Sequence, residues 1–85
     1  MIHVYVLYSQ IHDRIYIGMT NNLDRRLKEH NRGNNQSTKA YLPWIKIITE
    51  EYENRLDARK REKYLKSYRG RVFIRKILLN NPIIN

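Results

Sequence analysis

The sequence predicts an α+β domain in which a small three-stranded antiparallel sheet is flanked by helices, in the order β-β-α-β-α-α. Two observations support this prediction. Near the N-terminus, two segments with strand-like composition are separated by a short polar loop, which is typical of a hairpin. Later segments carry apolar residues at helical spacing behind Asn residues that suit helix caps. With 85 residues, the chain has the length of a single domain spanning residues 1–85.

Three segments are predicted to be strands. His3–Tyr8 is rich in Val and Tyr, which suit a pleated surface. The polar loop Ser9–Arg14 leads into a second strand, Ile15–Gly18, and the short connection favours antiparallel pairing. Pro43 suits the start of a strand, and the alternation from Trp44 to Tyr52 predicts the third one.

The first helix is predicted directly after the hairpin. Asn21 or Asn22 serves as its N-terminal cap, and Leu23 and Leu27, four residues apart, form its apolar stripe. Gly33 suits the end of this helix. The residues from there to position 39 are expected to form a polar loop without core residues.

The second helix is predicted behind Asn54, with Asp57 three residues later in an arrangement similar to a capping box. This helix is expected to run to about Lys66 and to be broken by Tyr68–Gly70.

A third helix is expected over Val72–Leu79 and should end at Pro82. Phe73 and Ile77 are expected to face inward, together with Ile74 and Leu78.

The charge of the chain points to a nucleic-acid partner. Seventeen Lys and Arg against eight Asp and Glu give a net charge of +9 and a pI of about 10.1. A basic surface that serves solubility, or one that faces acidic lipid, is the alternative. Cysteine is absent, which excludes disulfides. The sequence contains neither an apolar run of about 18 residues nor a signal-peptide pattern, so a cytoplasmic location without membrane contact is expected. A protein partner or a homodimer stays open.

Two residues of the first predicted helix could bind and act on a phosphate. Arg26 and His30 are four residues apart, so they share a face beside the apolar stripe, about 6 Å from each other. A guanidinium binds a phosphate through two parallel hydrogen bonds, and an imidazole donates to it or relays a proton. The alternative is a solvated face, because Arg25, Lys28 and Glu29 lie on the same helix.

Tyr5 and Tyr16 lie in the two strands of the predicted hairpin. Pairing of the strands could place both phenols near one end of the sheet, where a tyrosine of lowered pKa acts as a base or a nucleophile. The alternative is structural, since tyrosine suits strands and the chain contains seven of them.

Glu62 is a candidate metal ligand. Ala58, Glu62 and Leu65 follow helical spacing, which places the carboxylate on the buried stripe of the second helix. Buried carboxylates are paired or bind a metal, and Mg²⁺ or Mn²⁺ uses one or two carboxylates together with water and phosphate oxygens. The alternative is a salt bridge to Arg26 or to a neighbouring Arg.

Basic residues in the loop and on the helices are candidates for contacts with nucleic acid, which would give affinity that depends on salt but not on sequence. Trp44 could stack on a base, although a place at the edge of the core is favoured. The basic residues chosen as nucleic-acid contacts are Arg25, Lys39, Arg59 and Lys66.

In order and spacing, these residues resemble the GIY-YIG nuclease superfamily in its minimal stand-alone form, the small bacterial URI-domain proteins. The chain is similar also to the N-terminal incision domain of the excision-repair nuclease subunit UvrC. His3-Val4-Tyr5 stands where the first motif ends in Tyr, with His3 in place of the motif's first glycine, and Tyr16-Ile17-Gly18 is the second motif. Arg26, eight residues after that glycine, matches the catalytic arginine, and His30 matches a common downstream histidine.

The second predicted helix extends the resemblance. The run from Ala58 to Glu62, followed by Leu65 and Lys66, looks like the helix that carries the metal-binding glutamate. The resemblance covers nearly the whole chain, from Ile2 to about Leu78.

The resemblance implies a metal-dependent DNA endonuclease that selects DNA structure or damage rather than sequence and acts in DNA repair or recombination. One Mg²⁺ or Mn²⁺ would be held by Glu62, and Arg26 would stabilise charge on the phosphoryl oxygens. Tyr5 or Tyr16 would take a proton from the attacking water, and His30 would assist through a hydrogen bond. The alternatives are a non-catalytic nucleic-acid-binding module that acts in a complex, and a ribosome-associated basic protein, which rests on size and charge alone.

Overall fold

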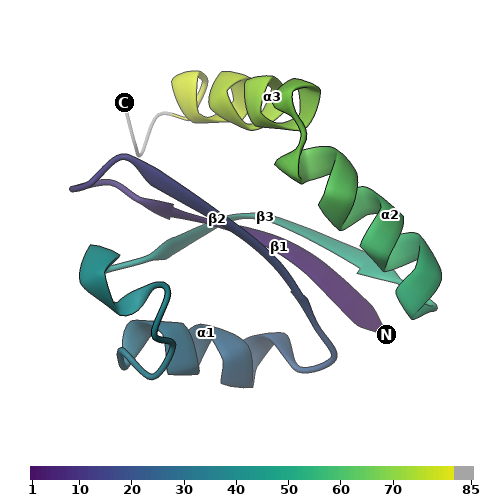
Figure 1. Cartoon of the computed structure of the whole chain (residues 1–85), viewed down its shortest axis with the longest axis horizontal. Coiled ribbons are helices and arrows are strands. Elements are labelled where there is room, and N and C mark those ends of the chain that lie inside the picture. The colour runs from purple at the N-terminus through teal and green to yellow at the C-terminus, as the bar shows by residue number, and fades with distance from the viewer. Residues whose placement is uncertain (82–85) are drawn as a thin grey trace.

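The computed structural model describes residues 1–81 and confirms the predicted order of strands and helices (Figure 1). The predicted end of the last helix at Pro82 lies outside the described residues. The elements are β1 (Ile2–Ser9), β2 (Arg14–Thr20), α1 (Leu23–Asn31), the short 3₁₀ helix η1 (Lys39–Tyr41), β3 (Ile45–Tyr52), α2 (Arg55–Lys66) and α3 (Tyr68–Leu79).

The sheet has the strand order β2-β1-β3, with both pairs antiparallel. β1 is therefore the central strand and β2 is an edge strand. The helix α1 lies on one side of the sheet, and α2 and α3 lie on the other (Figure 1). His3, which replaces a glycine of the motif that the sequence resembles, pairs regularly with Thr20 on β2 and with Glu51 on β3.

Because helices cover both faces of the sheet, β1 contributes to two separate cores. Tyr5 and Leu7 face α1 and pack with Trp44, which is buried and lies just before β3 rather than inside it. Burial of Trp44 agrees with the core position favoured by the sequence. The alternate residues of β1 face α2 and α3, in the core formed by Val4, Val6, Tyr8, Ile17, Ala58, Leu65, Ile74 and Leu78.

Asparagine side chains begin the first two helices as expected. The Asn22 side chain accepts a hydrogen bond from the backbone N–H of Arg25, and Asn54 accepts one from Asp57. Each side chain satisfies a backbone donor that the first turn of a helix leaves unpaired.

The predicted break at Tyr68–Gly70 is wrong, because α3 begins at Tyr68. Ser67 alone separates the two helices, with an extended backbone, and its hydroxyl accepts from the N–H of Gly70. Gly70 lies within the first turn of α3, where a Cβ atom would clash with the backbone of Tyr64 and Leu65. This glycine therefore permits close packing of two helices and does not end one.

The inward face of α3 agrees with the predicted one at Ile74 and Leu78 and differs from it at Phe73 and Ile77. Gly70, Ile74 and Leu78 are buried at helical spacing, whereas Phe73 is 37% exposed and Ile77 is half-buried. The contact at Gly70 sets the rotation of α3 about its axis, and the residues four and eight positions later consequently face the sheet.

Candidate active site

A cleft of about 430 Å³ lies along the edge strand β2. Its walls include side chains from β1, β2, α1 and α2, and Arg71 from α3. Four of the five residues predicted to act on a phosphodiester line this cleft: Tyr5, Tyr16, Arg26 and Glu62. The fold therefore brings together side chains that are separated by up to 57 residues in the sequence, from 5 to 62.

The pairing of β1 with β2 positions the two phenols. Tyr5 lies opposite Gly18 in the antiparallel register, and the ring centroids of Tyr5 and Tyr16 are 6.2 Å apart. A Cβ atom at position 18 would lie 2.6 Å from the Tyr5 Oη atom. Gly18 thus leaves the space that the Tyr5 phenol occupies. This explains why a glycine follows Tyr16-Ile17 in the motif.

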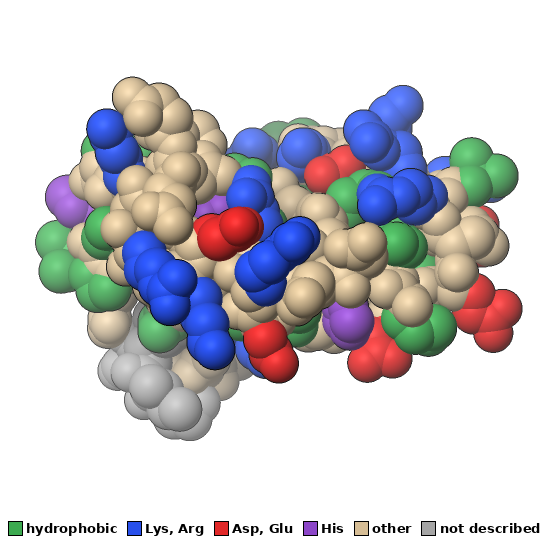
Figure 2. Space-filling view, turned by 90° about the horizontal axis from the view of Figure 1, so that it is seen from below, with side chains coloured by type: hydrophobic (Ala, Val, Ile, Leu, Met, Phe, Trp, Pro, Cys, Tyr) green, Lys and Arg blue, Asp and Glu red, His purple; other side chains and the backbone are tan. Residues whose placement is uncertain are grey.

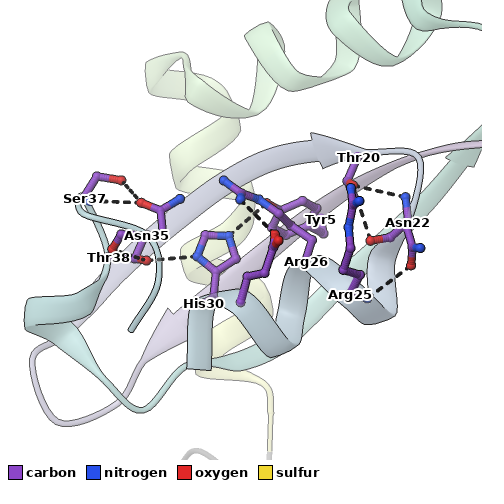
Figure 3. A network of polar contacts seen from close by, with 10 residues as sticks. Tyr5, Thr20, Asn22, Arg25, Arg26, His30, Asn35, Ser37 and Thr38 are labelled. Carbon is purple, nitrogen blue, oxygen red and sulfur yellow. Dashed lines mark hydrogen bonds and ion pairs between the residues drawn. The ribbon is translucent and has the colours of Figure 1, made fainter. Parts of the chain in front are cut away.

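His30 lies behind the phenols in a buried polar network (Figure 3). Its Nε2 atom is 3.0 Å from the Tyr5 Oη atom, and its Nδ1 atom is 2.9 Å from the Thr38 Oγ1 atom. The expectation that His30 lies at the edge of the apolar stripe is wrong, because its exposed fraction is 0%. The expectation of a loop without core residues is wrong as well, since Thr38 is 1% exposed and closes this network.

Burial sets the protonation of both groups. It raises the pKa of Tyr5 to about 12, although the neighbouring Arg26 guanidinium opposes part of this shift. Burial, together with the positive charge of Arg26, lowers the pKa of His30. At neutral pH the Tyr5 phenol therefore keeps its proton and the His30 imidazole is neutral.

Arg26 projects from α1 into the cleft beside both tyrosines. Hydrogen bonding to the Tyr5 phenol, with smaller contributions from Glu29 and Tyr16, raises the pKa of Arg26, so its positive charge is permanent. Its Nη1 atom also donates to the Glu29 carboxylate over 3.2 Å. A guanidinium held in this way presents a cation at the point where the two phenols meet.

Glu62 occupies the buried position predicted for it. It is 8% exposed and shares the buried stripe of α2 with Ala58 and Leu65. Its carboxylate does not pair with Arg26, because Arg59 and Lys66 lie closer, at 3.6 Å and 3.5 Å. The pair with Arg59 is the salt bridge to a neighbouring Arg that the sequence left open as an alternative, although both distances exceed those of strong charge-assisted hydrogen bonds.

The donor set of the cleft suits one hard cation bound mainly by water and substrate. Among residues 1–81, no group of three or more His, Asp or Glu side chains is arranged to enclose a metal ion. Glu62 supplies a single carboxylate that faces the cleft. Mg²⁺ is commonly bound in this way, with one or two carboxylates, water and phosphate oxygens. The residues present fit such an ion.

The cleft has an excess of positive charge. Of the residues predicted to contact nucleic acid, Arg59 and Lys66 line it, whereas Arg25 and Lys39 lie elsewhere and are exposed. The exposed face that carries α1 shows Lys and Arg side chains interspersed with acidic ones (Figure 2). Five cations against one carboxylate make the cleft itself attractive to a polyanion. The five are Arg26, Arg55, Arg59, Lys66 and Arg71.

Three residues of the site are outside the sets chosen for the reaction and for nucleic-acid contacts, although Thr38 and Arg71 belong to the loop and helices considered for such contacts. Arg55 lies four residues before Arg59 and seven before Glu62, so helical spacing alone could have placed it on the same face. Arg71 belongs to the next helix, and Thr38 to a loop. No local pattern places either of them near the cleft.

None of the helices between residues 1 and 81 has the length and apolar character needed to cross a bilayer.

Comparison with known proteins gives the same family as the motifs. The model of the GIY-YIG catalytic domain matches residues 1–75. The chain is also similar to the UPF0213 protein CPE1444 of Clostridium perfringens, with 37% identity over 67 residues, which represent 78% of this chain and 71% of that protein. No solved structure matches at the same significance. The family match and this relative show that the chain belongs to the GIY-YIG family of nuclease domains.

Proposed function

We propose that the protein is a metal-dependent DNA endonuclease that hydrolyses phosphodiester bonds. The observation that supports this function is the single cleft in which two phenols, the Arg26 guanidinium and the Glu62 carboxylate meet. The cationic walls of the cleft suit a polyanionic backbone rather than a small neutral substrate.

Arg26 is assigned to the scissile phosphate. Its planar guanidinium donates two parallel hydrogen bonds to phosphate oxygens and stabilises the charge that grows on them in the transition state. The other cations of the cleft, on α2 and α3, would bind neighbouring phosphates, and these contacts position the strand without reading its sequence.

Tyr5 is the proton acceptor in this proposal, because it alone of the two phenols is hydrogen-bonded to His30. With a pKa of about 12 it is not a phenolate in the free protein, so it must pass on its own proton as it takes one from water. The neutral His30 Nε2 atom, 3.0 Å away, is placed to receive that proton. Tyr16 would orient the attacking water.

Glu62 is the residue that would hold the cation. A bound Mg²⁺ or Mn²⁺ would polarise the phosphate and neutralise charge on the leaving oxygen. Arg59 and Lys66 approach Glu62 from its own helix, and both side chains are at least half exposed. Such exposed pairs are weak, so they can turn toward phosphates when a cation binds.

We further infer that selection rests on DNA structure or damage, within repair or recombination. Phosphate contacts carry no base information, and the assigned residues of the cleft are phosphate-binding cations. Action with a protein partner or as a homodimer, in the cytoplasm, is compatible with this role.

A cleavage assay in Mg²⁺ tests the proposal, with single-stranded, nicked, flapped and four-way DNA as substrates. We expect the wild type to cut at least one branched or nicked substrate and to stop on addition of EDTA. Glu62→Ala should abolish cutting while DNA affinity stays within a few-fold. The protein would be a binding module instead if the wild type cuts nothing on a broad panel of DNA and RNA. Its binding would then be independent of metal and unchanged in Glu62→Ala.

A further inference from the structure

The polar network extends beyond the residues that the proposed reaction uses. Thr38 is buried, yet it lies in the loop between α1 and η1 and lines no part of the cleft. Its Oγ1 atom lies 3.4 Å from the carbonyl oxygen of Asn35 and 2.9 Å from His30 Nδ1 (Figure 3). A threonine hydroxyl has a single proton, so it donates to one of these neighbours only.

The carbonyl of Asn35 accepts from the backbone N–H groups of Thr38 and Lys39, and in the arrangement assigned here it also takes the Thr38 hydroxyl proton over 3.4 Å. A lone pair of Thr38 Oγ1 is then directed at His30, and in this arrangement the Nδ1 atom carries the imidazole proton. In a neutral imidazole the other nitrogen is an acceptor. His30 Nε2 therefore faces Tyr5 with a free lone pair, and the Tyr5 hydroxyl donates to it.

The other groups around His30 are compatible with this arrangement. Tyr5 approaches from β1, and the Tyr16 ring from β2 lies with its centroid 4.8 Å away. Arg26 and Glu29, from the same helix, have opposite effects on the pKa of His30, which Arg26 lowers and Glu29 raises. The net effect of burial and these charges is a neutral imidazole. A neutral imidazole carries its single proton on either Nδ1 or Nε2, so its tautomer decides which nitrogen can accept a proton.

The backbone of Thr38 is held in place by Trp44. The indole Nε1–H of Trp44 donates to the Thr38 carbonyl oxygen over 2.9 Å, and the backbone N–H of Trp44 donates to the Asn31 side chain. Trp44 is itself part of the core on the α1 side. The loop is thus attached both to α1 and to the core, which holds the Thr38 backbone beside His30.

We propose that Thr38 is a positioning residue that holds His30 in its Nδ1–H tautomer, so that Nε2 accepts the Tyr5 proton. Its consequence for catalysis rests on the proposed nuclease function. In that step a water proton moves to the Tyr5 oxygen while the Tyr5 proton moves to His30 Nε2, which forms an imidazolium. The water oxygen bonds to phosphorus, the bond from phosphorus to the leaving oxygen breaks, and that oxygen takes a proton from solvent. The imidazolium then returns its proton to solvent through Tyr5. With the opposite tautomer, Nε2 carries a proton and cannot accept one.

Thr38→Val and Thr38→Ser form a matched pair, because valine keeps the shape of threonine without its hydroxyl and serine keeps the hydroxyl. The first readout is the nitrogen NMR spectrum of the free protein, which distinguishes the two ring nitrogens of a neutral histidine. The chain has three histidines, so the signal of His30 is assigned by its loss in His30→Gln. Cleavage kinetics are the second readout, and thermal unfolding verifies that each variant is folded.

We expect the wild type and Thr38→Ser to show a protonated Nδ1 and an unprotonated Nε2 at His30. Thr38→Val should give a mixed or reversed tautomer and a kcat about 10- to 100-fold lower with an unchanged KM, which is less than the roughly 10²- to 10⁴-fold of a whole proton-transfer step because part of the imidazole keeps the productive tautomer. A wild-type spectrum with a protonated Nε2 would overturn the proposal, and so would a reversed tautomer in Thr38→Val with unchanged kcat. If the wild type cuts nothing, the proposed function fails, but the spectra still decide whether Thr38 sets the tautomer.

Discussion

The two sides of the cleft are built in opposite ways. On the α1 side, Tyr5, His30 and Thr38 are at most 1% exposed and are joined by hydrogen bonds of 2.9 to 3.0 Å. On the α2 side, Glu62 is held by Arg59 and Lys66 at 3.5 to 3.6 Å, and these two side chains are 60% and 51% exposed. One side is closed and fully partnered, whereas the other is open and only loosely paired.

The difference matches the tasks that the proposed reaction gives to each side. Buried polar groups are costly unless every one has a partner, so a proton-transfer network inside the core must be complete before substrate binds. A site for a cation and for phosphates must keep coordination positions accessible, and weak exposed ion pairs can be exchanged at little cost. In the proposed reaction, the buried side therefore sets the positions of protons and the open side supplies charge that can adjust to the substrate.

The largest expected effect separates the two phenols of the buried side. Tyr5→Phe should lower the single-turnover cleavage rate by about 10³, within the range for loss of a general base. Tyr16→Phe should lower it less, since Tyr16 has no hydrogen bond to His30 among those described. A rate that survives Tyr5→Phe but falls in Tyr16→Phe would reverse the assignment of the proton acceptor.

Arg26→Lys tests whether the geometry of the guanidinium matters as well as its charge. Lysine keeps the charge but lacks the planar pair of donors, so kcat should fall by about 10²-fold, comparable to the loss of one donor to a developing oxyanion. The dissociation constant for DNA, measured by fluorescence anisotropy without metal, should change by no more than a few-fold. Full activity of Arg26→Lys would mean that a point charge suffices.

Gly18→Ala tests how tightly the buried side is packed. The new Cβ atom would lie 2.6 Å from the Tyr5 Oη atom, so we expect a loss of about 1 to 3 kcal/mol in the free energy of unfolding, typical of overpacking, and a lower cleavage rate.

Gly33→Ala is the control for this change, measured by urea unfolding. Gly33 has a φ of 79°, and its added Cβ atom would meet nothing closer than 3.6 Å. Alanine at position 33 should therefore lower stability through backbone strain while the cleavage rate of the folded protein stays unchanged. Equal loss of rate in both variants would contradict the assigned role of Gly18.

On the open side, Arg59→Gln and Lys66→Gln should each weaken DNA binding by a few-fold at moderate salt. Each should also reduce the slope of log K against log salt by roughly 0.7 to 0.9, the change expected for one phosphate contact. Lys60→Gln is the matched control, because Lys60 is exposed on the same helix but does not line the cleft. A slope that changes equally in all three variants would mean that the cleft is not the binding surface.

The smallest expected effect is the dependence of the free energy of unfolding on pH. Burial lowers the pKa of His30 in the folded protein, so the unfolded chain binds a proton at this residue more readily. The free energy of unfolding should therefore decline as the pH falls below about 6.5, the ordinary pKa of histidine, and this stability is fully present above it. His30→Gln should lose this dependence below about pH 6.5, as measured by urea unfolding. Hydrogen bonds from Tyr8 and Arg75 lower the pKa of Asp13. The stability that Asp13 contributes is therefore lost at more acidic pH, below the ordinary pKa of a carboxyl group.

Much of the fold and part of the site followed from local patterns. Asn22 and Asn54 were recognisable as caps, and the three strands were recognisable from composition, because both features depend on neighbouring residues only. The buried place of Glu62 followed from its spacing to Ala58 and Leu65. The same reasoning failed at Gly70, where a residue that often ends helices is needed for contact between two of them.

The sequence by itself determined the order of strands and helices, the positive charge and the candidate side chains for phosphodiester chemistry. These properties depend on composition and on spacing along the chain. Only the tertiary structure decided that β1 is central, that His30 is buried and that Thr38 and Arg71 belong to the site. Which faces meet depends on the simultaneous packing of helices on both sides of the sheet, and no local pattern contains that information.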